Sequence, residues 1–496
     1  MQNSRSESSA IGTARRRSFT VSVLAAFVLL NGLLFSLSVE KMEDGQMYSA
    51  TYWNASDGQR YWGTAINLAE KGEFSIATAN DEPLSRAGPL PALLFSLPIK
   101  WAGFEAAPVW IVSLQCALLA IMGWLAGEMT PGRRETKTLA QLLVMFNPNL
   151  VGLAHHAQSD LIFGFFLAVM IFGAVRMIAQ ERNKVMPMFL LCGLAAGGLT
   201  LSRPAGQFFV VVFPIFVLVA LAVHRKLSGV DLRRYLIGTV LYLSIFAALV
   251  VPWAARNHAV LGDFGLSQSE AIMMRDQYKF LLRFTGVNPG DRSKAMRIAG
   301  EDYLLSRGAD PTCLNRLKDP DCKSLMTKAY LSAILDLPPS EISQGLFSAW
   351  MTLYFGPATG RIANYIGIES SDLHALLVNQ FDGFSSFKDY LKSAIVEHGK
   401  YAILLILFSG FVLATRIFGT VGLLRSFVGR DLRGIGVFFL LTLGLFSAMY
   451  LFVGISRYRA PLEIMLMMLS AIGYQTVSDR VRLRKWVGTS PRSDSR

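Results

Sequence analysis

Apolar residues gather along the chain in long blocks that are separated by polar and charged connections. Most blocks are about 18–22 residues long, which is the length that an α-helix needs to cross a hydrocarbon core of ~30 Å. The blocks predict about ten membrane crossings, near residues 20–39, 106–129, 138–154, 159–179, 186–202, 206–223, 235–254, 400–417, 434–454 and 460–477. The pattern therefore predicts an all-α polytopic membrane protein.

The composition indicates the same class. Hydrophobic residues make up 52% of the 496 residues and charged residues only 17%, and the mean hydropathy is +0.39. A soluble enzyme, a disordered chain and a disulfide scaffold are excluded, because none of these classes carries apolar sequence in repeated blocks of this length.

A membrane location also explains the net charge of +13. Such a charge could indicate nucleic-acid binding, but the basic residues lie in short connections and tails beside the apolar blocks, as they do in cytoplasmic loops. We therefore expect both termini inside and no nucleic-acid partner. The basic clusters are Arg15–Arg17; Arg133, Arg134 and Lys137; Arg182 and Lys184; Arg225, Lys226, Arg233 and Arg234; Arg416, Arg425, Arg430 and Arg433; and Arg480–Lys485.

The predicted crossings divide the chain into five parts. No A-x-A-like cleavage site follows the first apolar block, so this block is expected to remain as a signal anchor. The parts are a cytoplasmic basic tail at 1–19, an N-terminal transmembrane module at 20–255 that includes an outside loop at 40–105, a large outside loop at 256–398, C-terminal transmembrane helices at 399–477, and a cytoplasmic basic tail at 478–496.

The two outside segments are expected to contain helices. In the first, an amphipathic helix is predicted over Asp57–Lys71 and is ended by Gly72. The stretch Pro89–Trp101 is too short to cross the membrane and is expected to lie at the interface as a second helix. The large loop mixes turns with helix-like stretches at Asp291–Arg307 and Lys323–Leu335, so a mostly helical region is predicted there.

The four cysteines fall into two pairs. Cys116 and Cys192 lie inside predicted spans, where a thiol behaves as a small apolar group. Cys313 and Cys322 lie nine positions apart in the large outside loop. If that side of the membrane is oxidising, a disulfide between them is expected, and the surrounding residues do not resemble a zinc site.

Ionisable residues are scarce at mid-depth in the predicted spans and collect near the outer ends of the spans. Arginines close to a carboxylate at a membrane–water interface suit a substrate with a lipid tail and an anionic phosphate head, because guanidinium groups bind phosphate oxygens bidentately. The residues are Asp57, Arg60, Arg86, His155, His156, Asp160, Arg203, Arg256, His258, Arg457, Arg459 and Glu463.

The adjacent histidines of this set do not indicate a metal site. Neighbouring side chains on a helix point about 100° apart. We therefore expect His155 and His156 to form a solvated end of a span.

Six stretches resemble, in the same order along the chain, the motifs of the GT-C glycosyltransferases that use lipid-phosphate sugars. That family includes protein O-mannosyltransferases and the aminoarabinose transferases that modify lipid A. The stretches cover residues 57 to 461 and read DGQRYWGTAINLAEKG from Asp57, SRAGPLPALL from Ser85, SDLIF from Ser159, LSRP from Leu201, PWAARN from Pro252 and SRYRAP from Ser456.

The resemblance implies a GT-C-like fold and transfer of a sugar from a polyprenyl phosphate to an acceptor. Asp57 would be the catalytic base, supported by Asp160, which would orient the acceptor or hold a cation. The family's second acidic residue is replaced here by Gly58, so a divalent cation is left open and no cofactor is assigned. The donor phosphate would be bound by Arg60, Arg86, Arg203 and Arg457, and the substrate pocket would include Tyr61 and Arg256.

The resemblance also sets the expected location and partners. The chain would lie in a bacterial inner membrane among the membrane lipids, with its catalytic module and large loop facing the periplasm. The donor would carry undecaprenyl or decaprenyl phosphate, and the acceptor would be lipid A, another envelope glycan or a protein. Two alternatives stay open: a flippase for lipid-linked intermediates, and a related ligase or polymerase that uses a diphosphate-linked donor.

Structural roles remain open for the same residues. Asp57 and Asp160 could instead stabilise helix N-termini, where the macrodipole favours a negative charge. Arg60 and Arg86 could extend to the interface as anchors. Arg203 could belong to a tight turn with Pro204, and Arg256 and Arg457 could bind bulk lipid headgroups.

Overall fold

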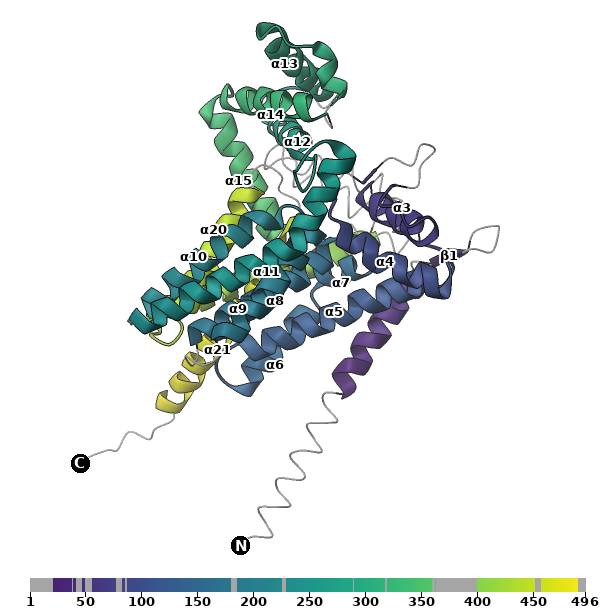
Figure 1. Cartoon of the computed structure of the whole chain (residues 1–496). Helices are drawn as coiled ribbons and strands as arrows, with labels where there is room; N and C mark the ends of the chain where they lie inside the picture. The colour runs from purple at the N-terminus through teal and green to yellow at the C-terminus, as the bar shows by residue number, and fades with distance from the viewer. Residues whose placement is uncertain are drawn as a thin grey trace, which may run out of the picture.

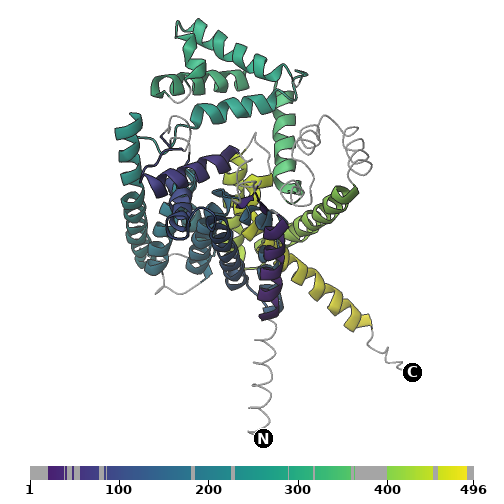
Figure 2. The same ribbon diagram turned by 90° about the vertical axis from the view of Figure 1, so that its right-hand side faces the viewer.

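The computed structural model of the protein describes most of the chain (Figure 1). The described residues are 21–37, 39–41, 47–49, 56–76, 83–84, 87–179, 185–224, 229–288, 290–316, 319–358, 362, 399–450 and 456–488. The first described helix and the last part of α21 extend from the same side of the helix bundle, and a smaller group of helices stands on the opposite side (Figure 2).

The described chain is almost entirely helical. Seven of its helices are long and apolar enough to cross a membrane, and the shorter apolar helices Val21–Leu37 and Arg433–Met449 accompany them. The prediction of an all-α polytopic membrane protein is therefore confirmed, with one small antiparallel hairpin as an addition. The elements are β1 (Val39–Lys41), β2 (Met47–Ser49), α3 (Ser56–Glu70), α4 (Pro89–Ala102), α5 (Ala107–Met129), α6 (Arg134–Met145), α7 (Pro148–Ala154), α8 (Asp160–Ala179), α9 (Val185–Ser202), α10 (Gly206–His224), α11 (Gly229–Leu261), α12 (Glu270–Leu281), α13 (Arg292–Ser306), η2 (Pro311–Asn315), α14 (Pro320–Leu335), α15 (Pro339–Phe355), α19 (Gly399–Val428), α20 (Arg433–Met449), η4 (Ser456–Leu462) and α21 (Glu463–Gly488).

One predicted crossing, at 138–154, is not a continuous helix. It consists of α6 and α7, which are 12 and 7 residues long. The break has a local cause, because the side chain of Asn147 accepts hydrogen bonds from the backbone N–H groups of Asn149 (3.0 Å) and Leu150 (3.3 Å), and Pro148 stands in the first turn of α7. An Asn cap followed by Pro starts a new helix instead of continuing the old one.

A second correction concerns Arg416, which the charge pattern placed in an inside connection. Helix α19 continues past residue 417 to Val428, and Arg416 is buried within it. The burial is tolerated because the guanidinium group is paired with Glu463, 3.2 Å away.

Glycines let α19 and α21 pack closely along this region. A Cβ atom at Gly422 would lie 1.9 Å from the carbonyl oxygen of Leu469, and one at Gly473 would lie 1.8 Å from that of Phe418. The two backbones are therefore too close to leave room for any side chain at these positions, as in small-residue contacts between membrane helices. These two helices therefore form one rigid pair.

The helices outside the bundle have a small core of their own. Residues of α12, α13 and α14 bury apolar side chains against one another, and the predicted helices at 291–307 and 323–335 are confirmed as α13 and α14. The predicted disulfide is also present, since Cys313 and Cys322 are bonded with their Cα atoms 4.9 Å apart. Helix α15 leads from this group back to the bundle (Figure 2).

Candidate active site at one end of the bundle

Helix α3 forms over nearly the range that its apolar stripe predicts. Tyr61 and Trp62 are buried in a cluster that also includes Ala157 and Ile162, so the helix lies against the residues that surround the start of α8. Gly72 ends the helix region with φ of +74°, a conformation that glycine adopts without strain. Helix α3 is thereby held at one end of the bundle (Figure 1).

Helix α4 is placed by a close backbone contact. A Cβ atom at Gly88 would lie 2.1 Å from the carbonyl oxygen of Leu201, near the C-terminal end of α9. Pro89 follows in the first turn of α4, where a missing N–H costs nothing. The predicted helix at 89–101 is thus confirmed. Its start packs against Leu201, which lies two residues before Arg203.

The centre of this region is a buried carboxylate between two arginines. Asp160 begins α8 and is fully buried, and it accepts a hydrogen bond from Arg203 Nη1 at 2.6 Å. The same carboxylate accepts a hydrogen bond from Arg457 Nε at 2.7 Å. The two arginine side chains are each 15% exposed, so the group reaches the surface through the arginines and not through Asp160.

Aromatic rings line this group on one side. The guanidinium group of Arg203 lies over the ring of Tyr458, 5.1 Å from its centroid, and Tyr458 stacks on Tyr450 with ring centroids 4.6 Å apart. Tyr61 of α3 packs in the same cluster as Ile162 and Leu201, which lie two residues from Asp160 and Arg203. The first outside segment and the three sequence-distant residues of the ion group therefore belong to one site.

The turn before α8 is held from two directions. Gln115 of α5 donates hydrogen bonds to the carbonyl oxygens of Ala154 (3.1 Å) and His156 (2.9 Å). Asn31, in the first helix, contacts Nε2 of His155 at 3.0 Å. Both histidines are buried, so the expectation that they form a solvated end of a span is wrong. The turn folds inward because these polar groups find partners inside the bundle.

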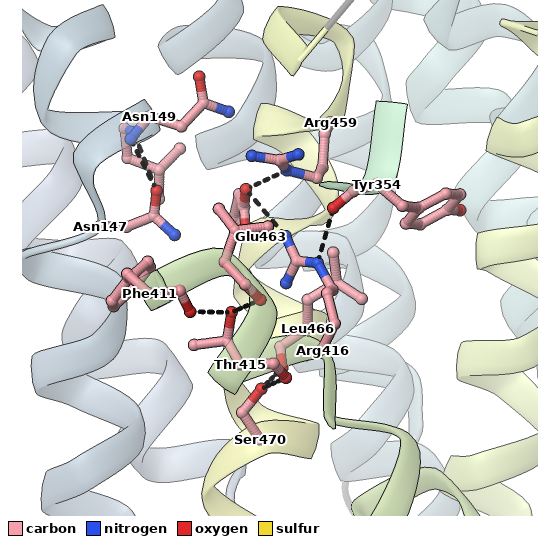
Figure 3. A network of polar contacts seen from close by, with 12 residues as sticks. Asn147, Asn149, Tyr354, Phe411, Thr415, Arg416, Arg459, Glu463, Leu466 and Ser470 are labelled. Atoms are coloured by element: carbon pink, nitrogen blue, oxygen red, sulfur yellow. Dashed lines mark hydrogen bonds and ion pairs between the residues drawn. The ribbon is translucent and has the colours of Figure 1, made fainter. Parts of the chain in front are cut away.

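A second ion group lies beneath the same end of the bundle, and Figure 3 shows it from close by. Glu463 accepts hydrogen bonds from Arg459 Nε at 2.5 Å and from Arg416 Nη2 at 3.2 Å. Arg459 and Glu463 lie in η4 and at the start of α21, as expected, whereas the burial of Arg416 of α19 beside them was not expected. Two sequence-distant cations and one carboxylate are buried together, because each neutralises part of the other's charge.

This second ion group also receives the end of α15. Arg459 Nη1 donates to the carbonyl oxygens of Leu353 (2.8 Å) and Gly356 (3.0 Å), and Arg416 Nε donates to that of Tyr354 (2.9 Å). Carbonyl groups at a helix C-terminus have no partner within the helix, and cations stabilise them. The helices outside the bundle are thus anchored to it through α15.

Arg256 binds backbone groups of the chain that follows α3. It donates hydrogen bonds to the carbonyl oxygens of Phe74 (2.9 Å) and Leu84 (3.0 Å) and lies over the ring of Trp253. The side chain joins α11 to the chain that follows α3.

The structure brings only part of the predicted site together. Arg203 and Arg457 each contact Asp160, and Tyr61 packs in the cluster that includes Ile162, two residues from Asp160. Arg60 lies on α3 one residue before Tyr61. Asp57 also lies in α3, but its side chain is outside the described residues, and Arg86 is outside them altogether.

Tyr450, Tyr458 and Arg416 were not predicted as site residues. Tyr458 stands inside the SRYRAP stretch, which is a signal that was available. The contacts of Tyr450 and Arg416 depend on helices far away in sequence.

The described residues offer little for a metal ion. No group of three or more His, Cys, Asp or Glu side chains that could hold one occurs among them. Asp160, which was considered for holding a cation, is already between two guanidinium groups. Two guanidinium groups and one carboxylate leave a single positive charge, which favours an anionic ligand such as a phosphate.

No protein-family model matches the chain, and no curated protein matches it in sequence. Among solved structures, the chain is similar to the archaeal oligosaccharyltransferase AglB from Archaeoglobus fulgidus in complex with an inhibitory peptide and a dolichol-phosphate, with 12% identity, a TM-score of 0.46, and 96% of this chain and 52% of that chain covered. It is also similar to ArnT from Cupriavidus metallidurans bound to undecaprenyl phosphate, with 15% identity, a TM-score of 0.35, and 95% and 81% covered. The chain spans about half the length of the oligosaccharyltransferase.

Proposed function

We propose that the protein is an integral-membrane, inverting glycosyltransferase that moves a sugar from a polyprenyl phosphate to an acceptor hydroxyl. The observation that carries the proposal is the contact of Asp160 with Arg203 and Arg457 beside α3 at one end of the bundle. These three side chains carry a single net positive charge. A lipid phosphate could reach this charge while its tail stays in the membrane.

The reaction needs a group that stabilises the departing phosphate. The acceptor oxygen attacks the anomeric carbon, the bond from that carbon to the phosphate oxygen breaks, and the bonding electrons leave with the phosphate. Arg203 and Arg457 are fixed by Asp160 before substrate arrives, so no reorganisation is required when the negative charge develops. Arg60 and Arg86 would add to this binding from the first outside segment.

The proton of the acceptor hydroxyl must go to a base. Asp57 is our candidate, on the basis of the sequence resemblance. Asp160 fits this role less well, because it is fully buried and both of its carboxylate oxygens already accept hydrogen bonds from arginines. We assign Asp160 the role of a positioning residue that holds the two arginines, and Tyr61 the role of a wall of the substrate pocket.

The location follows from the same proposal. The site would face the periplasm of a bacterial inner membrane, where undecaprenyl- or decaprenyl-phosphate sugars and lipid A, envelope glycans or protein acceptors are available. Arg256 would shape the pocket indirectly, since its hydrogen bonds position the chain after α3.

Transfer in proteoliposomes tests the proposal. The wild-type chain is given a polyprenyl-phosphate donor with a labelled sugar and an envelope extract as acceptor pool, and the label is followed in every product fraction. We expect transfer by the wild type and a loss of transfer in Asp57→Asn of equal folding. Movement of labelled lipid across the bilayer, without transfer and equal in both proteins, would support the flippase. Transfer only from a diphosphate-linked donor would support the ligase or polymerase.

A further inference from the structure

A groove lies between α6, α19 and α21, and its mouth is far from the Asp160 site described above. Its volume is about 1080 Å³, which is slightly larger than the usual range of about 300–1,000 Å³ for sites that bind small molecules. Figure 1 shows α6 and α21 at the end of the bundle away from α3 and α4. The length of α5 shows how far apart the two regions are. Ala107, at its start, packs in the cluster of Tyr61, and Met129, at its end near the groove, lies 22 residues later, about 33 Å at 1.5 Å per residue.

The mouth of the groove is charged. Arg134 and Arg482 are exposed there, and Arg133 is paired with Asp479 at 3.0 Å. With Glu135, the lining holds three arginines and two carboxylates, which leaves a single positive charge. The N-terminus of α6 lies at the same mouth, and the positive end of a helix dipole favours an anion.

The deeper wall is apolar. It is formed by Leu139, Leu142 and Leu143 of α6 and by Phe411 and Phe418 of α19. Along α21 the lining extends from Arg482 to Ser470, which is about 18 Å at 1.5 Å per residue. A charged mouth above an apolar channel of this length matches one anionic head group and one extended hydrocarbon chain.

The walls of the groove are fixed to one another. Thr136 of α6 donates a hydrogen bond to Gln475 Oε1 of α21 at 2.5 Å. A Cβ atom at Gly132 would lie 2.7 Å from the same oxygen, and Gly132 has φ of +104°, so the turn before α6 can approach α21 only with glycine. The groove is thus a preformed feature between locked helices, and binding there would cost little ordering.

We propose that this groove binds one anionic phospholipid from the leaflet opposite the Asp160 site. The phosphate lies at Arg134 and Arg482, and one acyl chain extends along Leu139 and Leu142 toward Phe411. A phosphodiester carries one negative charge, which the net charge of the lining complements. The inner end of the groove reaches Thr415, the neighbour of Arg416, so the lipid would lie next to the ion group that holds α15.

Native mass spectrometry of the full chain tests the proposal, with phosphatidylglycerol and phosphatidylcholine as probes. The wild type is expected to retain one phosphatidylglycerol and much less phosphatidylcholine. Ala414→Trp fills the groove and is expected to lower retention about tenfold, whereas Leu413→Trp, at the exposed neighbouring position outside the lining, is the control. Arg134→Gln and Arg482→Gln are each expected to lower phosphatidylglycerol retention about fivefold, and Arg430→Gln, outside the lining, is expected to leave it unchanged.

Equal retention of the two lipids, or equal retention by the groove and control variants, would show that only annular lipid is bound and would overturn the proposal. Thermal unfolding of the wild type gives a second measurement that does not depend on a variant. Phosphatidylglycerol is expected to raise the melting temperature with saturation, because a ligand that binds only the folded state stabilises it. The absence of a saturable rise would contradict a specific site.

Discussion

Asp160 and Arg457 lie 297 positions apart in the chain, and their side chains meet at 2.7 Å at one end of the bundle. The contact joins the start of α8 to the turn before α21, and Arg203 completes it from the end of α9. One carboxylate therefore positions both arginines and links the ends of three membrane-spanning helices. This dependence should make the effects of mutating the three residues non-additive.

Replacing Arg457 with Gln should reduce sugar transfer far more than it reduces stability. The lost guanidinium group would stabilise the departing phosphate, and removal of one preorganised donor typically costs ~10²–10³-fold in rate. Transfer rates in proteoliposomes at saturating donor measure the effect. Arg430→Gln is the control, because it removes the same charge at the exposed turn between α19 and α20. If both variants lose activity equally, the arginine has no specific role at the phosphate.

Asp160→Asn should lower both stability and transfer. Removal of one partner from a buried charge pair leaves the other charges uncompensated and costs about 3–5 kcal/mol. Thermal unfolding of the purified chain measures the loss. A double-mutant cycle with Arg203→Gln separates coupling from general damage, because the double variant should be less destabilised than the sum of the two single variants. Additive losses would contradict a direct energetic link between the two side chains.

The sequence was sufficient to predict the helical membrane class, the two helices at 57–71 and 89–101, and the residues of the ion group as separate candidates. It could not show that Asp160 contacts Arg203 and Arg457, because such contacts arise only when helices distant in sequence pack. The break between α6 and α7 did have a local signal in Asn147 and Pro148. The apolar block at 138–154 is nevertheless long enough to predict a single crossing, and this prediction missed the break.

Buried charge was the main failure of prediction. Arg416 looks like a basic residue at the end of a span, and its true position depends on Glu463, 47 positions away. The histidines before α8 were placed in solvent for a related reason, since Asn31 and Gln115 supply partners that no local pattern indicates. Hydrophobic periodicity reports which residues avoid water and does not report which polar residues find partners inside.

Gly88→Ala should impair transfer without preventing membrane insertion. The added Cβ would lie 2.1 Å from the carbonyl oxygen of Leu201, a backbone atom that cannot rotate away, so the start of α4 must move from the end of α9. Transfer activity and hydrogen exchange of α4 measure the displacement. Gly410→Ala is the matched control, because its Cβ would meet no atom within 4 Å. Normal activity of Gly88→Ala would show that the position of α4 is unimportant for the reaction.

Cys313→Ser should weaken the outside helices selectively. The bond closes a loop with a sequence separation of nine residues, and its loss should destabilise that region by about 2–3 kcal/mol on the chain-entropy model. Limited proteolysis should cut between α13 and α14 faster than in the wild type, and the wild type treated with reductant should behave in the same way. Cys192→Ser, at a buried position in α9, provides a comparison in which cleavage of the outside helices should not change. Equal protease resistance of reduced and oxidised wild type would contradict the prediction.

The docking of α14 onto the chain after α11 should depend on pH. Asp263 accepts a hydrogen bond from Lys323 at 2.5 Å and another from the backbone N–H of Gly265 at 2.9 Å. Burial alone would raise the pKa of Asp263, but the hydrogen bonds and the charge of Lys323 outweigh it and lower the pKa below the ordinary value of 3.8. Because the folded pKa is lower than the unfolded pKa, the stabilisation is complete above about pH 4 and is lost as the pH falls through the folded value.

Hydrogen exchange of the α14 amides, corrected for intrinsic rates, checks this dependence between pH 6 and pH 2. Protection should be constant down to about pH 4 and should then decrease. Lys323→Met removes the partner, so it should lower protection at pH 6 by about 1–2 kcal/mol and make the acid dependence shallower, because the pKa of Asp263 then rises toward or above its ordinary value. Lys294→Met, on α13, removes the same charge outside this contact and should leave both quantities unchanged. If Lys323→Met keeps the acid dependence of the wild type, then another carboxylate controls the docking of α14.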